Sequence, residues 1–575
     1  MKKTFQKYLV ESTVVLFILT LILPHPPVYG QEVNPLIKIH AEFERGRLTA
    51  DEAILKQIDL LKNHTHSNEN VSKCGTPLFF MMGNYEHQLS EETKAAFNQA
   101  FLASSGIASE SFISASGKFV VNYETTGSDA VPLADENNNF IPDYVEWIAE
   151  AADSSYSHYL NLGFTDIFTE KIAPYEIRVE DGGAYGFTSG NARYVGIEND
   201  FSGFPSNTDP EGNQKGAVKV TVAHELKHVI QFVQNGWAGD PDRWLEMDAT
   251  LYEEVIYDDV NDYYNYLEGF ANNLFGSPTS TIIPGSYEDI TWALYFEERF
   301  GNTFWTNVWN RIESQSPSIS FLGAIESALT DFEVSFEQAT IENLLWHYAS
   351  GRDNSTMFFG FDESAVYPSP RIQDVISQIQ LNLSDIETLS RFSGKYFEFN
   401  LAEQNPNFVK IDILANSSNI QTGLIAYYND LSVETVLITD PTPDELTFEE
   451  TNLSWEEIDR LGVVFFNTSI ASSQTVQFQV YDYIPVNITS PELDQNYPNP
   501  FNPTTTIAVT LPFSQQIKLT LYDSIGREVK IVKEGVLPSG KSEILFNASN
   551  LATGVYFYQL KSNEGMVTKK MTLIK

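Results

Sequence analysis

The spacing of hydrophobic and polar residues changes along the chain and divides it into regions of different predicted structure. An early polar region has helical spacing, a longer region mixes short strands with helices, and the final regions alternate with the two-residue period of strands. The predicted fold class is multidomain, with an α+β domain followed by two β-sandwiches. The boundaries are 1–30 for a signal peptide, 31–105 for a helical segment, 112–385 for the α+β domain, 386–484 for a β-sandwich, and 492–575 for a small C-terminal β-sandwich.

The first 30 residues have the parts of a signal peptide. Lys2, Lys3 and Lys7 give a basic start, residues 14–23 are apolar, and a small residue, Gly30, closes the stretch. The apolar part is shorter than the roughly 20 residues of a membrane-spanning helix. We therefore expect an exported mature protein without a membrane span.

Helix starts are visible within residues 31–105. Pro35 suits the first turn of one helix, Thr49 with Glu52 forms the pattern of a capping box, and Ser90 suits an N-cap. These signals predict separate helices joined by an extended or turning segment around Cys74.

The charge balance limits the class of partner. The chain has 35 basic and 77 acidic residues, a formal charge of −42, but 42% of its residues are hydrophobic, which is typical of a folded protein. A surface with this much negative charge argues against nucleic acids and anionic membranes as partners. It is compatible with binding sites for divalent cations. We expect a monomer, and the single cysteine rules out an intrachain disulfide.

A helix predicted over residues 220–231 carries the pattern His-Glu-x-x-His. His224 and His228 are four residues apart and lie on the same helix face, where one tetrahedral Zn²⁺ can take both imidazoles. Glu225 can reach the open side of such a metal and accept a proton from water. The other positions are mostly apolar, which predicts a buried helix ending at Gly236.

A third zinc ligand is expected from a second helix predicted over residues 244–254. Glu246 is the first choice, and Asp248, Glu253 and Glu254 are alternatives. Glu253 lies two turns beyond Glu246 on nearly the same face, so it also suits a role in orienting a histidine ring through its N–H group.

The sequence of the two helices resembles the gluzincins, zinc peptidases with a downstream glutamate ligand, and within them a family of secreted bacterial metalloproteases. The shared pattern is Trp-x-Glu-x-x-Ala, here Trp244, Glu246 and Ala249, and the resemblance extends over about 112–350. It implies a zincin-like fold, zinc bound by His224, His228 and Glu246, and peptide hydrolysis with Glu225 as the base. The alternatives are a chance match on a core helix and a zinc site without turnover.

A residue that stabilises the oxyanion is also expected in such an enzyme. His347, Tyr287 and Tyr295 are candidates, and each also suits a purely structural role. The pattern does not distinguish them.

Cys74 lies in Lys73-Cys74-Gly75-Thr76-Pro77, upstream of the predicted zinc helix. The segment resembles the cysteine switch of metalloprotease prosegments, which implies that residues 31–105 are a prosegment whose thiolate occupies the fourth zinc position. Lys73 stands where the switch has arginine, and this departure weakens the expected clamp on a carboxylate. The alternative is a buried thiol that acts as a small hydrophobic residue.

Residues 135–146 nearly fit a twelve-residue calcium loop. Oxygen ligands would come from the residues at positions 1, 3, 5, 7, 9 and 12, and Phe140 stands at position 6, where glycine is usual. The alternative is an asparagine-rich turn before a helix that begins near Asp143. The six predicted Ca²⁺ ligands are Asp135, Asn137, Asn139, the Ile141 carbonyl, Asp143 and Glu146.

The end of the chain resembles the sorting domain of the Por, or type IX, secretion system. The resemblance covers about 492–575 and includes the proline-rich run 496–503, the turn before Val555, and the final lysines Lys569 and Lys570. It implies interaction with the secretion machinery and a secreted or cell-surface product. An ordinary adhesive β-module is the alternative.

Together these patterns predict a secreted zinc peptidase that acts on protein or peptide substrates. The alternative is a secreted surface or adhesion protein in which the zinc is structural. A structural zinc site normally has four protein ligands, whereas a catalytic site leaves one position open.

Overall fold

In the computed structural model, a six-stranded sheet positions the predicted zinc helix. The structure describes residues 6–8, 35–62, 72–102, 110–168, 174–239, 244–267, 273–315, 318–351, 359–380, 382–401, 409–430, 432–438, 446–448, 458–482, 490–511, 515–537, 540–562 and 565–575. The chain forms two compact units, of which the first comprises Met1–Asn405, Ile411–Phe448 and Glu456–Val480 and the second the rest. Most of the predicted signal peptide lies outside the described residues.

The sheet has the strand order β2-β6-β7-β5-β4-β3. Strand β2 runs parallel to β6, β6 is antiparallel to β7, β7, β5 and β4 are parallel, and β3 is antiparallel to β4. Buried and partly buried residues alternate along β4 and β5, as expected for strands with one face on the core. The strands are Ser72–Cys74 (β2), Glu110–Ile113 (β3), Phe119–Tyr123 (β4), Tyr175–Glu180 (β5), Ala184–Ser189 (β6) and Tyr194–Glu198 (β7).

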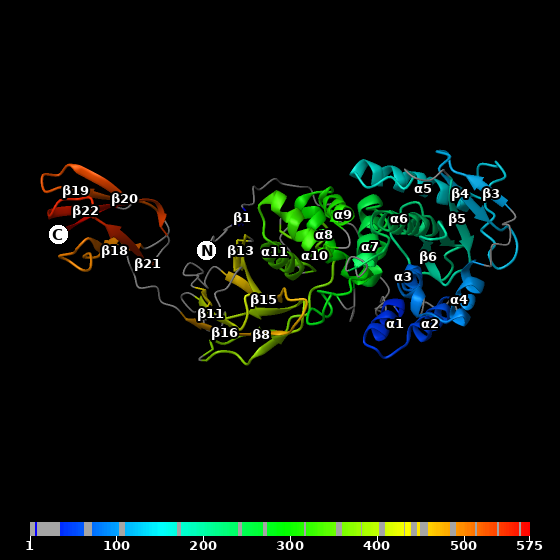
Figure 1. Cartoon of the computed structure of the whole chain (residues 1–575), viewed down its shortest axis with the longest axis horizontal. Helices are drawn as coiled ribbons and strands as arrows, with labels where there is room; N and C mark the ends of the chain where they lie inside the picture. Colours follow the sequence, from blue (N-terminus) through cyan, green and yellow to red (C-terminus); the bar gives the residue numbers. More distant parts are fainter. Residues whose placement is uncertain are drawn as a thin grey trace. The chain divides into compact units, whose positions relative to one another are not determined.

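Helix α6, Asn213–Asn235, packs against β6 and lies between α5, Asp143–Leu162, and α7, Leu245–Ile256 (Figure 1). Its central residues are buried all round, and it ends at Gly236, whose φ of 67° is left-handed. The predicted helix and its end are confirmed. Further helices follow at Ile290–Phe300 (α8), Phe304–Gln315 (α9), Phe321–Leu329 (α10) and Phe336–Ala349 (α11).

The upstream region forms α1 (Pro35–Glu44), α2 (Ala50–Lys62), α3 (Thr76–Tyr85) and α4 (Glu91–Phe97), with a π-helical turn at Asn98–Leu102. The capping box is confirmed, because the backbone N–H of Thr49 donates to Glu52 and that of Glu52 donates to Thr49. Ser90 caps α4 as predicted. Helix α3 was not predicted, since its first turns are almost wholly apolar and buried and so show no amphipathic period. These helices share one hydrophobic core with the sheet.

Two sheets follow in the same unit, with orders β1-β13-β12-β15-β10-β8 and β14-β11-β16-β9. Aromatic rings join them, because Phe478 of β16 lies 4.9 Å from Phe397 of β10. Helix α11 packs against β12 and β15. The strands are Gln6–Tyr8 (β1), Asp374–Ile376 (β8), Glu387–Leu389 (β9), Ser393–Phe399 (β10), Val409–Ala415 (β11), Ile420–Tyr428 (β12), Val433–Ile438 (β13), Leu446–Phe448 (β14), Ile458–Asn467 (β15) and Gln474–Asp482 (β16).

The C-terminal unit contains the sheets β17-β18-β21 and β20-β19-β22-β23 around a core of its own. Tyr558 of β22 fixes the start of the unit, because its hydroxyl donates to the carbonyl of Asp494 and accepts from the N–H of Asn496. The strands are Glu492–Leu493 (β17), Thr504–Leu511 (β18), Gln515–Tyr522 (β19), Glu528–Leu537 (β20), Gly540–Asn547 (β21), Gly554–Ser562 (β22) and Gly565–Leu573 (β23). None of the helices in the described ranges is long and apolar enough to cross a membrane.

Candidate metal centre

Four side chains with metal-ligating atoms meet beside α6. His224, His228, Glu246 and Cys74 are all buried, and their ligand atoms lie within 4.8 Å of one another. The Nε2 atoms of the two histidines are 3.1 Å apart, and the Cys74 Sγ lies 3.5 Å from the His228 Nε2. Glu246 approaches both rings, at 3.2 Å from His228 and 3.6 Å from His224. Among the described residues, no other cluster of this kind occurs.

The spacing of these atoms fits zinc. A tetrahedral Zn²⁺ with bonds of about 2.0–2.1 Å to nitrogen and 2.3 Å to sulfur places two nitrogens roughly 3.3 Å apart and a nitrogen and a sulfur roughly 3.6 Å apart. The observed distances are close to these values. Both carboxylate oxygens of Glu246 are buried without a hydrogen-bond partner among the described residues, which a cation would supply.

A carboxylate supports the ring of His224. The Nδ1 of His224 lies 2.7 Å from Glu253 Oε1, and the other oxygen of Glu253 lies 2.7 Å from the ammonium of Lys73. Lys73 also pairs with Asp262. Burial works against the ammonium, but the charges of Asp262 and Glu253 raise the pKa of Lys73 above its ordinary value. Glu253 therefore lies where a residue that orients His224 would lie.

An amide supports the ring of His228. The Nδ1 of His228 lies 2.7 Å from Gln231 Oε1, and the Gln231 amide nitrogen donates to Asp248 Oδ2 and to the Leu245 carbonyl. Both of those atoms can only accept, so the Gln231 oxygen must face His228, whose Nδ1 then carries the proton and leaves Nε2 for a metal. The sequence prediction missed Gln231, although its place three residues after His228 on the same helix face was a signal.

The alternatives for the third ligand lie elsewhere. Asp248 contacts Gln231 and lies 3.2 Å from the Lys227 ammonium. Glu254 is outside the cluster, and burial together with the charge of Glu363 raises its pKa to about 10. Of the four acidic candidates on α7, only Glu246 reaches the two Nε2 atoms.

The carboxylate of Glu225 is closely held. Its Oε1 lies 3.3 Å from the Cys74 Sγ, and its Oε2 accepts from the hydroxyls of Thr76 at 3.1 Å and Thr188 at 2.7 Å. Burial raises the pKa of Glu225. The predicted base thus lies beside the cluster, with two residues of the upstream segment against it.

Cys74 reaches the cluster from the edge strand β2. Its N–H donates to the Tyr287 hydroxyl at 3.1 Å, and its sulfur accepts from the N–H of Thr76. Burial and the charges of Glu225 and Glu246 raise the pKa of the Cys74 thiol. A bound cation has the opposite effect, because metal ligation deprotonates a thiol.

Of the three candidates for the oxyanion role, only Tyr287 lies at the cluster, with its ring 6.5 Å from that of His224. Tyr295 packs against Trp346. His347 is buried between the Thr291 hydroxyl and the Asn343 carbonyl, and burial lowers its pKa to about 4.

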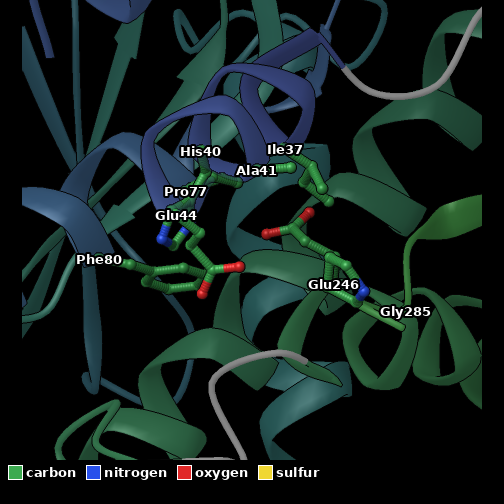
Figure 2. Close-up of a pocket in the computed structure, with 9 residues that line it drawn as sticks. Ile37, His40, Ala41, Glu44, Pro77, Phe80, Glu246 and Gly285 are labelled. Atoms are coloured by element: carbon green, nitrogen blue, oxygen red, sulfur yellow. The ribbon is translucent and has the colours of Figure 1, made fainter. Parts of the chain in front are cut away.

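A small cavity of about 40 Å³ borders the Glu246 side of the cluster. Figure 2 shows helix α1 over it, with the carboxylates of Glu44 and Glu246 pointing into it. Pro77 and Phe80 of α3 and Gly285 also line it. The upstream helices therefore cover this side of the candidate metal centre.

The predicted calcium loop is closed by its own hydrogen bonds. Asp135 accepts from the N–H groups of Asn139 and Phe140, and Glu146 accepts from the side-chain amides of Asn137 and Asn139. Phe140 has a φ of 70°, the conformation for which such loops use glycine. The carboxylates of Asp135, Asp143 and Glu146 do not gather into a ligand cluster, and calcium binding stays a prediction.

The C-terminal unit is the part of the chain with a recognised family. Residues 495–575 match the family described as the secretion system C-terminal sorting domain. This tail is a sorting domain. It indicates interaction with the type IX secretion machinery and export to the cell surface or the extracellular space. No curated protein matches the sequence.

Similar solved structures include two proteins of Porphyromonas gingivalis, of which PorZ is described as a surface component of the type IX secretion system. PorZ, a surface component of that system, is 14% identical over 24% of this chain and 20% of its own, with a TM-score of 0.12. Dimeric latent PorU is 18% identical over 36% of this chain and 19% of its own, with a TM-score of 0.13. Domains 3 and 4 of rat CD4 are 13% identical over 32% of this chain and 95% of their own, with a TM-score of 0.10. The chain thus spans about a fifth of the two bacterial proteins, and these scores define no shared fold.

Proposed function

We propose that the protein is a secreted zinc peptidase of the gluzincin type, kept latent by Cys74 until the upstream helices leave. The observation that carries the proposal is the position of Glu225, whose carboxylate lies beside a cluster of two histidines and a glutamate with zinc-like spacing. A general base next to such a cluster is what hydrolysis by an activated water requires.

The roles follow from the contacts. His224, His228 and Glu246 would hold the zinc, which would supply a Lewis acid that lowers the pKa of water and polarises the scissile carbonyl. Glu225 would take the proton from the attacking water and deliver it to the leaving amine. The Tyr287 hydroxyl would donate to the developing oxyanion. Glu253 and Gln231 would keep the two imidazoles in the tautomer that binds metal.

Latency would come from the segment around Cys74. Its thiolate would take the position that the attacking water needs, the Thr76 hydroxyl engages Glu225, and the backbone of Cys74 engages Tyr287. Each group with a proposed catalytic role therefore has an upstream partner. This arrangement fits a zymogen better than an isolated buried thiol.

A second candidate is a secreted binding protein with structural zinc. Cys74 favours it, because in the full chain the cluster offers four protein ligands, as a structural site does. The two candidates predict different results for a chain from which the thiol has been removed.

The test is hydrolysis of casein by the zinc-loaded Cys74→Ala chain. We expect cleavage by Cys74→Ala and little by the parent. Adding Glu225→Gln should lower cleavage by about 10³-fold, since the base is lost, while the zinc content stays the same. Glu254→Gln, in the same background, is the matched control for a buried glutamate of α7 outside the cluster. A Cys74→Ala chain that binds one zinc but does not cleave would favour the binding protein.

A further inference from the structure

The side chain of Lys73 enters a pocket made by downstream residues. It is 2% exposed, its ammonium lies 2.7 Å from Glu253 Oε2, and it pairs with Asp262 of the short helix η4, Asp262–Tyr266. The rings of Tyr185 and Tyr266 lie 5.1 and 4.8 Å from the ammonium. We call these four downstream residues the ammonium pocket.

The ammonium pocket suits a cation whatever chain supplies it. Its two carboxylates are buried, and taking away the ammonium would leave Asp262 without a counter-charge and Glu253 with His224 as its remaining partner, which is costly in a protein interior. The two tyrosine rings add cation–π attraction. Tyr185 also donates to Asp262 at 3.2 Å, which fixes that carboxylate toward the ammonium.

The backbone of the upstream segment lies where an added strand would lie. Strand β2 pairs with β6, with Ser72 opposite Ala184 and Cys74 opposite Gly186, and the N–H of Gly75 donates to the Gly186 carbonyl at 2.8 Å. An extended chain on this edge places one residue at the metal cluster and the neighbouring side chain in the ammonium pocket. Extended peptides commonly bind proteins by adding a strand to an exposed sheet edge.

We propose that, once the upstream segment has left, the ammonium pocket is a substrate subsite that selects a lysine side chain next to the scissile bond. The proposal rests on the proposed peptidase function and names its substrate class. Lys73 then has two uses, because it neutralises the pocket in the precursor and occupies it in place of the substrate lysine.

The first test measures recognition of the ammonium without catalysis. In the full-length Lys73→Ala chain, n-propylammonium replaces the atoms that were removed. We expect it to raise the Tm of that variant by about 2–4 °C near saturation, with no effect on the parent or on Lys73→Ala/Asp262→Asn. The neutral 1-propanol is the matched ligand and should have no effect. If Lys73→Ala folds poorly, its refolding yield with each ligand gives the same reading. Equal effects of the two ligands would overturn the proposal.

The second test measures substrate preference in the zinc-loaded chain after limited proteolysis has released the upstream segment, because that segment occupies the sheet edge until then. Peptides that differ only by lysine or norleucine at one position are compared. We expect kcat/KM to be about 10–100-fold higher for the lysine peptide and the ratio to fall near one when Asp262→Asn is added. Cleavage without a lysine preference overturns the subsite and leaves the peptidase standing. No cleavage of any peptide overturns the peptidase, and propylammonium binding would then identify the pocket as an anchor for Lys73 only.

Discussion

The two histidines of α6 are supported in different ways. His224 faces the carboxylate of Glu253, which pairs with Lys73 of the upstream segment. His228 faces the amide of Gln231, which donates to Asp248, and Asp248 lies next to Lys227 of α6 itself. Both networks end at a buried lysine, but only the first lysine belongs to the segment that the proposed activation removes.

The difference separates a permanent support from a removable one. Gln231, Asp248 and Lys227 lie within α6 and α7, so the tautomer of His228 does not depend on the upstream helices. Glu253 shares its charge between His224 and Lys73. Loss of the upstream segment would therefore take a charge from the Nδ1 support of His224 and leave the Nδ1 support of His228 in place.

The largest effect is expected from Lys73→Met. The change leaves Glu253 and Asp262 buried without their cation, and breaking a buried ion pair in this way costs about 3–5 kcal/mol. Urea unfolding followed by tryptophan fluorescence measures it, since no tryptophan lies in the sorting domain. Lys73→Met/Asp262→Asn should recover part of the loss, because one unpaired charge is gone. A Lys73→Met chain as stable as the parent would show that Lys73 is not a support of His224.

A third buried histidine gives a reference without any carboxylate. His347 contacts a hydroxyl and a backbone carbonyl, and burial lowers its pKa to about 4. A depressed histidine pKa means that the folded state favours the neutral ring. The contribution of His347 to the free energy of unfolding is therefore complete above the unfolded pKa of about 6.5 and is lost as the pH falls toward 4. The shift corresponds to about 3 kcal/mol.

We therefore expect metal-free parent protein to lose more stability than His347→Gln between pH 6.5 and 4, by up to about 3 kcal/mol. Unfolding free energies at a series of pH values give the comparison. His158→Gln changes an exposed histidine of α5 and serves as the control. Parallel pH curves for His347→Gln and the parent would contradict the assignment of a neutral, buried His347.

The sequence predicted the ligand geometry better than its supports. His224 and His228 follow from the helical period, which is local, whereas Glu246 was the first choice among four acidic residues, and the structure brings these three side chains together. The sequence predicts that Lys73 only weakly replaces arginine, yet it pairs with two carboxylates more than 170 residues away, and no local pattern encodes that contact. Helix α3 was not predicted for a different reason, because its first turns are apolar on all sides and so show no helical period of hydrophobic and polar residues. The paired sheets after residue 385 were predicted from alternation, but the parallel strand β8 before them was not.

The smallest effect is expected when both charges of the His228 network are removed together. Lys227 lies within 3.7 Å of the Phe164 ring centroid and 4.4 Å of that of Tyr252, and burial lowers its pKa to about 8 although Asp248 is adjacent. The attraction between Lys227 and Asp248 therefore does not offset the cost of burying the ammonium, and such a pair can be replaced by neutral groups with little loss of stability.

In Lys227→Met/Asp248→Asn, methionine fills the aromatic site and the asparagine oxygen still accepts from Gln231. We expect the unfolding free energy to change by less than about 1 kcal/mol and the zinc affinity, measured by chelator competition, by less than about threefold. A tenfold loss of zinc affinity at unchanged stability would mean that the charge of Asp248 acts on His228 through Gln231, and the two histidines would then have the same kind of support.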